Sequence, residues 1–223
     1  MSNPIRPTFD HELHGLQDNL LRLGSMLEAA LGRAIQSLTT RDVGLAQQVV
    51  ADDDKINALR YEIEEECFLA LATQQPTARD LRSVMAAFSM AADLERMADH
   101  AEGIATIVVR MGDEPLLKPL IDIPRMADTC RDMLRGALDA YVLRDEAKAR
   151  AVARRDDVID DLYQQVFREL LSFMLEDPHT ITRALYLLFI AHNQERIGDR
   201  AVNLAERVIF ITSGELKEFK GSV

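Results

Sequence analysis

Residues 93–105 read DLERMADHAEGIA and residues 193–205 read NQERIGDRAVNLA, so the second stretch repeats the first at an offset of 100 residues. The identical positions are Glu95, Arg96, Asp99, Ala101 and Ala105, matched by Glu195, Arg196, Asp199, Ala201 and Ala205. Upstream, at an offset of 103, Arg41, Asp42, Asp53, Asp54, Ile56 and Leu59 match Arg144, Asp145, Asp156, Asp157, Ile159 and Leu162. The matches keep their order and need only a short insertion or deletion in one loop, which predicts two homologous units in tandem.

Each unit is expected to contain three long helices. In the first helix, apolar residues recur every three or four positions, at Phe9, Leu13, Leu16, Leu20, Leu23, Leu27, Ala30, Ala34 and Leu38. Breaks at residues 41–42, 74–76 and 112–119 predict further helices over 42–73 and 77–111. Asp42 is expected to be the N-cap of the first of these, and Thr77 with Asp80 resembles a capping box for the second. The second unit repeats this plan over 119–143, 145–175 and 178–213, with Asp177 before Pro178 as the last helix start.

The predicted fold class is therefore all-α, with two tandem three-helix bundles over residues 1–112 and 113–223.

Composition and net charge argue against several classes of function for this chain. The net charge is −11, and no cluster of Lys and Arg is large enough for a nucleic-acid partner. The only cysteines, Cys67 and Cys130, stand alone on apolar helix faces, which favours core positions in a reducing compartment. Residues 1–7 lack the apolar region of a signal peptide, and no apolar stretch is long enough to span a membrane. We expect a cytoplasmic protein that reaches the membrane only through its partners.

Oxygen-bearing side chains form pairs four residues apart in each unit. The pairs are Asp53/Asn57 with Glu95/Asp99 in the first unit and Asp156/Asp160 with Glu195/Asp199 in the second. Members of a pair share one helix face, where Glu102 and His192 also fall. Facing oxygen pairs suit hard cations, and we predict that they bind ions such as magnesium, manganese or iron. The alternative is that the pairs are solvated or neutralised by Arg96 and Arg196.

Catalytic signatures are absent from the sequence. It has no GxGxxG, P-loop or GxSxG motif, and it lacks the two Glu-x-x-His motifs that di-iron bundles use together. We expect no enzymatic activity and no catalytic residues. His100 and His192 border the acidic stripes, where a surface or hydrogen-bonded role is favoured over metal ligation. Two alternatives remain open: a metal-storing or metal-dependent helical-bundle enzyme, and a structural helical protein without a ligand.

Several stretches resemble the PhoU family of phosphate-specific transport system accessory proteins. They are QPTARDLR at residues 75–82, DLERMADHA at 93–101, MLEDP at 174–178 and ERIGDRAVN at 195–203. The resemblance spans nearly the whole chain and implies multinuclear clusters of divalent or trivalent ions, such as iron, manganese, magnesium or zinc, held by the eight paired residues. It further implies a negative regulator of the phosphate-starvation response and a modulator of phosphate uptake. Such a regulator is expected to link the ATPase subunit of a phosphate ABC transporter to a membrane sensor histidine kinase, and the heptad-like first helix allows a homodimer.

Two positions depart from the symmetry of the repeat. Asn57 stands where the second unit has Asp160, and Gly103 stands where it has Asn203. Because Asn57 carries no charge, the first metal site is expected to be the weaker one.

Overall fold

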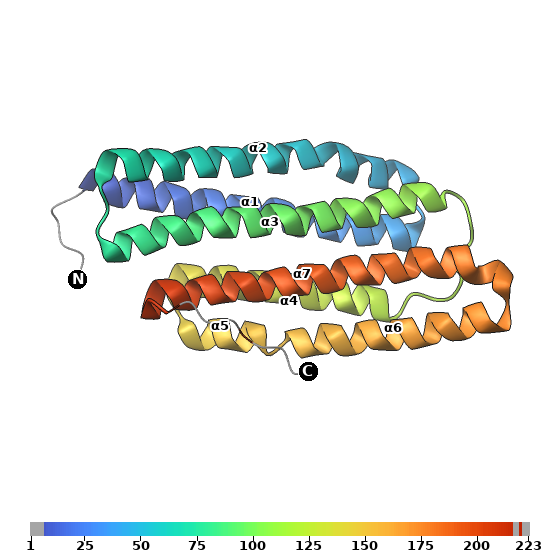
Figure 1. Cartoon of the computed structure of the whole chain (residues 1–223). Helices are drawn as coiled ribbons and strands as arrows, with labels where there is room; N and C mark the ends of the chain where they lie inside the picture. The colour runs from blue at the N-terminus through green and yellow to red at the C-terminus, as the bar shows by residue number, and fades with distance from the viewer. Residues whose placement is uncertain (1–6, 216–218, 220–223) are drawn as a thin grey trace.

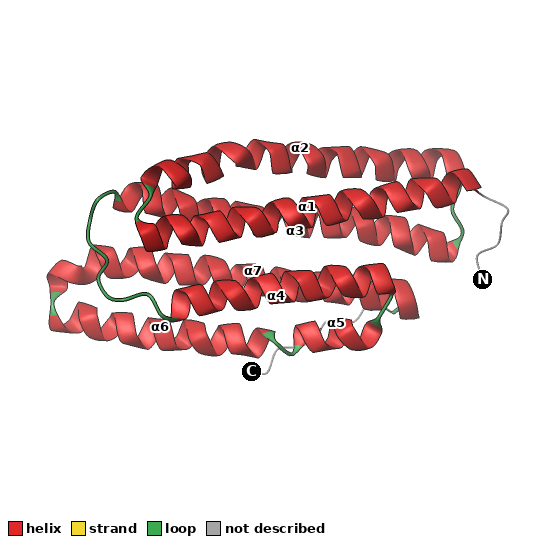
Figure 2. Ribbon diagram, turned by 180° about the vertical axis from the view of Figure 1, so that it is seen from behind, coloured by secondary structure: helices red, strands yellow, loops and turns green. Residues whose placement is uncertain are grey.

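The computed structural model describes residues 7–215 and residue 219. Its first half holds three long helices, α1 (Pro7–Thr40), α2 (Val43–Gln74) and α3 (Ala78–Met111). The second half holds α4 (Asp122–Leu143), α5 (Glu146–Ala153), α6 (Asp156–Glu176), the 3₁₀ turn η1 (Pro178–Thr180) and α7 (Ile181–Ser213). The described residues contain no strand, and Figures 1 and 2 show two elongated bundles of nearly antiparallel helices. The all-α prediction with two repeated bundles is confirmed.

The expected boundary between residues 112 and 113 lies just after α3, but the division into two domains stays a prediction. The expectation about residues 1–7 falls almost entirely outside the described residues.

The same turn joins the first two helices of each repeat. Asp42 N donates to Ser37 O at 2.9 Å and Asp145 N donates to Ala140 O at 3.0 Å, which closes a Schellman-type helix end. Arg41 and Arg144 occupy the left-handed position, with φ of 55° and 54°. The aspartates then cap the next helix: Asp42 accepts from Leu45 N and Asp145 from Lys148 N, each at 2.9 Å.

The prediction of one continuous helix over residues 145–175 was wrong. Arg155 N donates to Val152 O at 2.9 Å and Val158 N donates to Arg155 O at 3.1 Å, so the chain tightens into a turn between α5 and α6. The Arg155 side chain reaches Asp132 of α4 at 3.0 Å. The residues of the first repeat that are equivalent to Arg154 and Arg155 are Ala51 and Asp52. They lie inside the unbroken helix α2.

The predicted apolar seam forms part of the core. Of its nine members only Leu13 is half-buried, and the other eight are buried. Cys67 and Cys130 are also buried, as expected. Burial raises the pKa of the Cys67 thiol to about 12 and also raises that of Cys130, so both behave as core residues.

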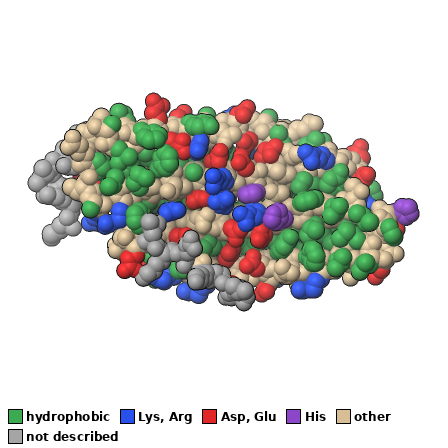
Figure 3. Space-filling view, in the orientation of Figure 1, with side chains coloured by type: hydrophobic (Ala, Val, Ile, Leu, Met, Phe, Trp, Pro, Cys, Tyr) green, Lys and Arg blue, Asp and Glu red, His purple; other side chains and the backbone are tan. Residues whose placement is uncertain are grey.

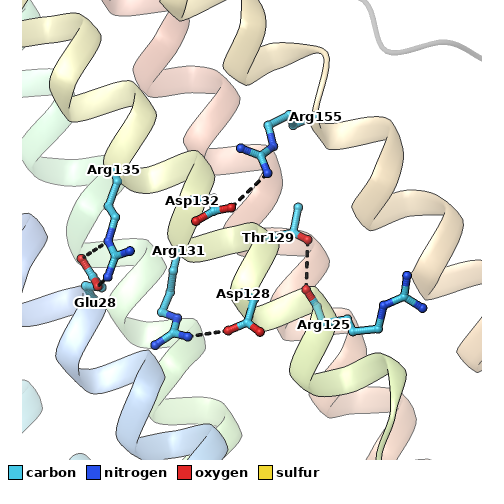
Figure 4. A network of polar contacts seen from close by, with 8 residues as sticks. All are labelled: Glu28, Arg125, Asp128, Thr129, Arg131, Asp132, Arg135 and Arg155. Carbon is cyan, nitrogen blue, oxygen red and sulfur yellow. Dashed lines mark hydrogen bonds and ion pairs between the residues drawn. The ribbon is translucent and has the colours of Figure 1, made fainter.

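The two bundles pack against each other through α3 with α7 and α1 with α4. On the α1–α4 side, Arg135 binds Glu28 across the interface, with Nε 3.0 Å from Oε2 (Figure 4). On the α3–α7 side, Arg200 Nη1 lies 3.2 Å from Asp93 Oδ1. This packing places α2, α3, α7 and α6 side by side in that order on one face of the molecule (Figure 1).

Candidate metal-binding faces

The first acidic face joins α2 and α3. Burial is the main cause that raises the pKa of Asp53, and the charges of Asp99 and Glu102 raise it further. The pKa of Asp99 is raised by burial first and then by Glu95. The expected residues of the first site therefore lie close enough for their charges to interact across the two helices.

Asn57 reduces the repulsion on this face. Its Nδ2 donates a hydrogen bond of 2.8 Å to Asp53 Oδ2, which favours the ionised carboxylate. The Asn57 amide therefore supplies part of the compensation that a cation would otherwise provide. Asn57 Oδ1 is buried without a hydrogen-bond partner.

The second acidic face joins α6 and α7, and all four of its expected residues are carboxylates. Burial raises the pKa of Asp156 to about 7, and the charges of Asp160, Asp199 and Glu195 raise it further, in that order. Burial followed by the charge of Asp199 also raises the pKa values of Asp160 and Glu195. The four expected residues of the second site are therefore electrostatically coupled.

Two carboxylate oxygens on the second face lack hydrogen-bond partners. Asp156 Oδ1 is buried with none, and Glu195 Oε2 lies 3.4 Å from His192 Nδ1 without receiving a hydrogen bond. Asp199 is partly compensated, because its Oδ2 lies 2.7 Å from Arg196 Nη1. Buried oxygens without donors and mutually repelling carboxylates both favour a bound cation.

Gly198 allows the two helices of this face to approach closely. A Cβ atom at this position would lie 2.8 Å from Asp156 Oδ1 and 2.8 Å from Ile159 Cδ1. The first repeat has Ala98 at the equivalent position, so the close approach belongs to the second face alone.

Glu102 is an acidic neighbour that the eight predicted residues do not include. It raises the pKa values of Asp53 and Asp99, and its Oε1 accepts a hydrogen bond of 2.7 Å from Thr106 Oγ1. Its place three residues after Asp99 could have identified it, but the second repeat has Val202 there, so the repeat comparison removed it.

The expected residues fit a metal by donor type, but the side chains are not gathered around one point. All eight offer oxygen, which suits hard cations. Within the part of the chain that the structure describes, however, no group of three or more His, Cys, Asp or Glu side chains is placed to hold a metal ion. The metal clusters and their residues therefore stay a prediction, in which the side chains would have to move toward the ion.

Basic side chains separate the two acidic faces. Figure 3 shows Asp and Glu above and below a central group of Lys, Arg and His side chains. His100 Nδ1 lies 2.9 Å from Asn193 Oδ1, while Asn193 Nδ2 donates to Phe189 O at 2.9 Å. Because the amide oxygen must accept, His100 carries its proton on Nδ1. Burial is the main cause that lowers the pKa of His100, whose hydrogen-bonded role agrees with the expectation.

The fold and its faces define a class of protein: a tandem pair of three-helix bundles with a carboxylate-rich face on each. The sequence model of the PhoU domain matches the chain twice, over residues 20–108 and 123–208. This protein therefore belongs to the PhoU family, as the quoted motifs predicted.

Relatives and solved structures agree along most of the chain. A phosphate-specific transport system accessory protein PhoU homolog from Aquifex aeolicus is 37% identical over 92% of this chain and 93% of its own length. One from Zymomonas mobilis is 40% identical over 93% and 87%. The crystal structure of PhoU from Pseudomonas aeruginosa matches with a TM-score of 0.89 and 35% identity, over 93% of this chain and all of that one. The phosphate transport system regulatory protein PhoU from Streptococcus pneumoniae matches with a TM-score of 0.89, 31% identity and coverage of 95% and 100%.

These relatives are named as transport accessory or regulatory proteins, not as enzymes. Among the described residues of this chain, no helix is both long and apolar enough to cross a bilayer.

Proposed function

We propose that this chain is a regulatory accessory protein of phosphate-specific transport. In this role it represses the phosphate-starvation response and modulates phosphate uptake, as an adaptor between a transporter ATPase subunit and a sensor histidine kinase. The observation that carries the proposal is membership of the PhoU family along nearly the whole chain, with relatives named as accessory proteins of phosphate transport. Cytoplasmic location and homodimer formation belong to the same proposal.

Exposed apolar side chains at both ends of the molecule suit protein partners. The end patch of the first repeat includes Phe68, Leu81 and Met85, and Phe68 packs edge-on against Phe88 at 5.6 Å. The end patch of the second repeat includes Leu175, Ile181 and Phe189. Figure 3 shows apolar side chains gathered at both ends of this face. Exposed apolar patches on a soluble protein are typical of interaction surfaces.

Deletion and complementation test the adaptor role. Cells that lack the chain should express starvation genes in high phosphate, and the wild-type chain should restore repression. Phe68→Glu and Phe189→Glu should fail to restore it and should lose capture of the ATPase subunit or the kinase. Val158→Glu is the matched control, since Val158 is nearly as exposed as Phe189 but lies in the first turn of α6, at the opposite end of that helix from Leu175. Normal repression by both patch variants would reject this contact surface, and normal repression without the chain would reject the function.

Metal on the acidic faces is a second part of the proposal. The coupled carboxylates and the unpartnered oxygens of Asp156 and Glu195 support it. Elemental analysis of the purified protein should find metal that the Glu195→Ala/Asp199→Ala double variant largely loses. If starvation genes also become active with that variant in high phosphate, the metal takes part in regulation. A wild-type protein that holds no metal under any loading condition would reject the clusters and leave the accessory role standing.

The two faces should differ in affinity. Asn57 already donates to Asp53, whereas Asp156 Oδ1 and Glu195 Oε2 have no donor, so the second face gains more from a cation. Asp199→Ala should therefore remove more metal than Asp99→Ala when metal per chain is counted. A larger loss from Asp99→Ala would reject the expectation that the first site is weaker.

A further inference from the structure

A cavity between the two repeats contains Arg144, which forms no ion pair with a carboxylate in the part of the chain that the structure describes. The cavity has a volume of about 240 Å³ and is bounded by α1 and α3 of the first repeat and the end of α4. Its polar lining comes from Asp10, His14, Gln17, Ser83, Tyr141 and Arg144. None of these residues belongs to the two acidic faces.

The Arg144 guanidinium is poorly satisfied. Its Nη1 is shielded from solvent without an acceptor, and its Nη2 donates only a long bond of 3.4 Å to Ser83 Oγ. Burial is the main cause that lowers the pKa of Arg144, and the positive charge of Arg79 lowers it further. Among the described residues, no carboxylate forms an ion pair with Arg144.

Stacking on Tyr141 does not supply the hydrogen-bond acceptors that the Arg144 guanidinium lacks. Arg144 Cζ lies 5.1 Å from the centre of the Tyr141 ring, and this cation–π contact supplies no hydrogen-bond acceptor oxygen. The N–H groups point outward in the plane of the guanidinium and still require acceptors. A buried donor without an acceptor destabilises a protein unless a ligand or water pairs with it.

The turn does not force Arg144 into the cavity. Arg41 holds the same left-handed position in the first repeat, with φ of 55° against 54°, yet its side chain is exposed. The backbone is thus satisfied equally well with the arginine in solvent. The turn therefore does not explain why the Arg144 side chain lies in the cavity.

We propose that this cavity binds free hydrogen phosphate, with Arg144 as its principal ligand. The planar donor fork of a guanidinium matches the oxygens of a tetrahedral oxyanion, and the Arg144 side chain is flexible enough to turn Nη1 toward a bound ion. Arg79, from the QPTARDLR stretch that the acidic faces leave unused, adds attraction from the start of α3. The volume lies below the usual range for drug-sized ligands, which favours a small ion.

Asp10 makes the choice of oxyanion specific. Its carboxylate lines the same cavity and would repel an anion that carries no proton. Hydrogen phosphate keeps an O–H group at neutral pH and can donate it to a carboxylate, whereas sulfate has none. A bound ion would also link α3 of one repeat to α4 of the other. This proposal does not depend on metal at the acidic faces.

Calorimetric titration of the full chain with sodium phosphate at neutral pH tests the site. Arg144→Gln should weaken phosphate binding at least about tenfold, and Arg79→Gln should weaken it about threefold. Arg41→Gln is the matched control and should bind as the wild type does. Arg79 is exposed, so its substitution keeps the test valid if Arg144→Gln disturbs folding, which melting followed by circular dichroism would reveal.

Three results would overturn the proposal. The first is no phosphate binding by the wild type. The second is equal binding by wild type and Arg144→Gln, because any bound phosphate would then lie elsewhere, for example on a metal. The third is tighter binding of methyl phosphate than of inorganic phosphate, which would assign the cavity to a phosphoryl group on a larger molecule.

Anion selectivity tests the role of Asp10. Sulfate should bind the wild type at least about tenfold more weakly than phosphate, and Asp10→Asn should narrow that difference. Equal affinity for the two ions in the wild type would overturn the assignment to hydrogen phosphate.

Discussion

Gln194 is a polar residue in the core of the second repeat. It is fully buried, and neither Oε1 nor Nε2 of its side chain has a hydrogen-bond partner. The equivalent residue of the first repeat is Leu94, which is also fully buried and similar in size. Gln194→Leu should therefore raise the free energy of unfolding by about 1–2 kcal/mol, measured by urea denaturation. A loss of stability would indicate instead that an ordered water pairs with the amide.

Asp156 should make stability depend on pH when metal is removed with a chelator. Its pKa is raised from 3.8 to about 7, so the folded state holds this proton more tightly than the unfolded state does. The stability that protonated Asp156 contributes to the folded state is fully present below pH 3.8 and is lost as pH rises through about 7. Above that pH, Asp156→Asn should be more stable than the wild type by about 1–2 kcal/mol, after allowance for solvent screening of a half-buried group.

Near pH 4 the two proteins should be equally stable, because Asp156 is then largely protonated in the folded wild type. Asp157→Asn, at an exposed neighbouring position, is the control and should show no comparable gain at high pH. Thermal melting of the wild type and the two variants in chelator, across this pH range, would measure these differences in stability. A constant difference between wild type and Asp156→Asn at all pH values would contradict the assigned titration.

At the scale of single elements, the start of α2 was predicted correctly. Asp42 was expected to cap the second helix, and its carboxylate accepts from Leu45 N at 2.9 Å. Asp42→Ala should lower the free energy of unfolding by about 1 kcal/mol, since the cap bond is lost. Asp18→Ala, on the exposed surface within α1, should change it by less than about 0.5 kcal/mol in the same denaturation experiment. Equal effects of the two substitutions would show that the cap contributes nothing specific.

The break between α5 and α6 was not predictable from local pattern. Arg154 and Arg155 are both acceptable inside a helix, and the repeat comparison favoured continuity because α2 is unbroken at these positions. The break comes with a tertiary contact, in which Arg155 reaches Asp132 on α4. The packing of α5 against α4 and α7 also accompanies the break, and contacts between elements distant in the sequence leave no signal in the local pattern.

At the scale of the whole molecule, the repeats meet through equivalent surfaces. Asp93 and Asn193 occupy matching positions, as do His100 and Arg200. Asp93 binds Arg200 at 3.2 Å, and Asn193 binds His100 at 2.9 Å. The contacts between α3 and α7 are therefore related by an approximate two-fold axis, as in an isologous interface between subunits.

The Asp93–Arg200 pair should contribute strongly to the packing of the repeats. Asp93 is only 7% exposed, and its Oδ1 also accepts from Asn203 at 3.4 Å. Asp93→Ala would leave the Arg200 guanidinium without its acceptor and should destabilise the protein by about 2–3 kcal/mol in urea denaturation. Glu28→Ala, which breaks the exposed pair with Arg135 on the other side of the interface, should have a much smaller effect. A similar loss of stability in both variants would show that the Asp93–Arg200 pair is not the main contact that stabilises the interface.

The sequence alone determined the fold class, the tandem repeat, the family and the four oxygen pairs. These features are carried by local periodicity and by residues at fixed offsets, which do not depend on how the two bundles pack. It did not identify Glu102, because the second repeat has Val202 at that position.

Only the tertiary structure determined which side chains are buried and which of them have hydrogen-bond or ion-pair partners. It placed Gln194 and Leu94 in equivalent core positions with different consequences, and it left Arg144 without a carboxylate while Arg41 stays in solvent. It also made Asp156 the most perturbed carboxylate of the second face. Desolvation and charge coupling depend on every group packed around a side chain, and most of those groups come from elements distant in the sequence.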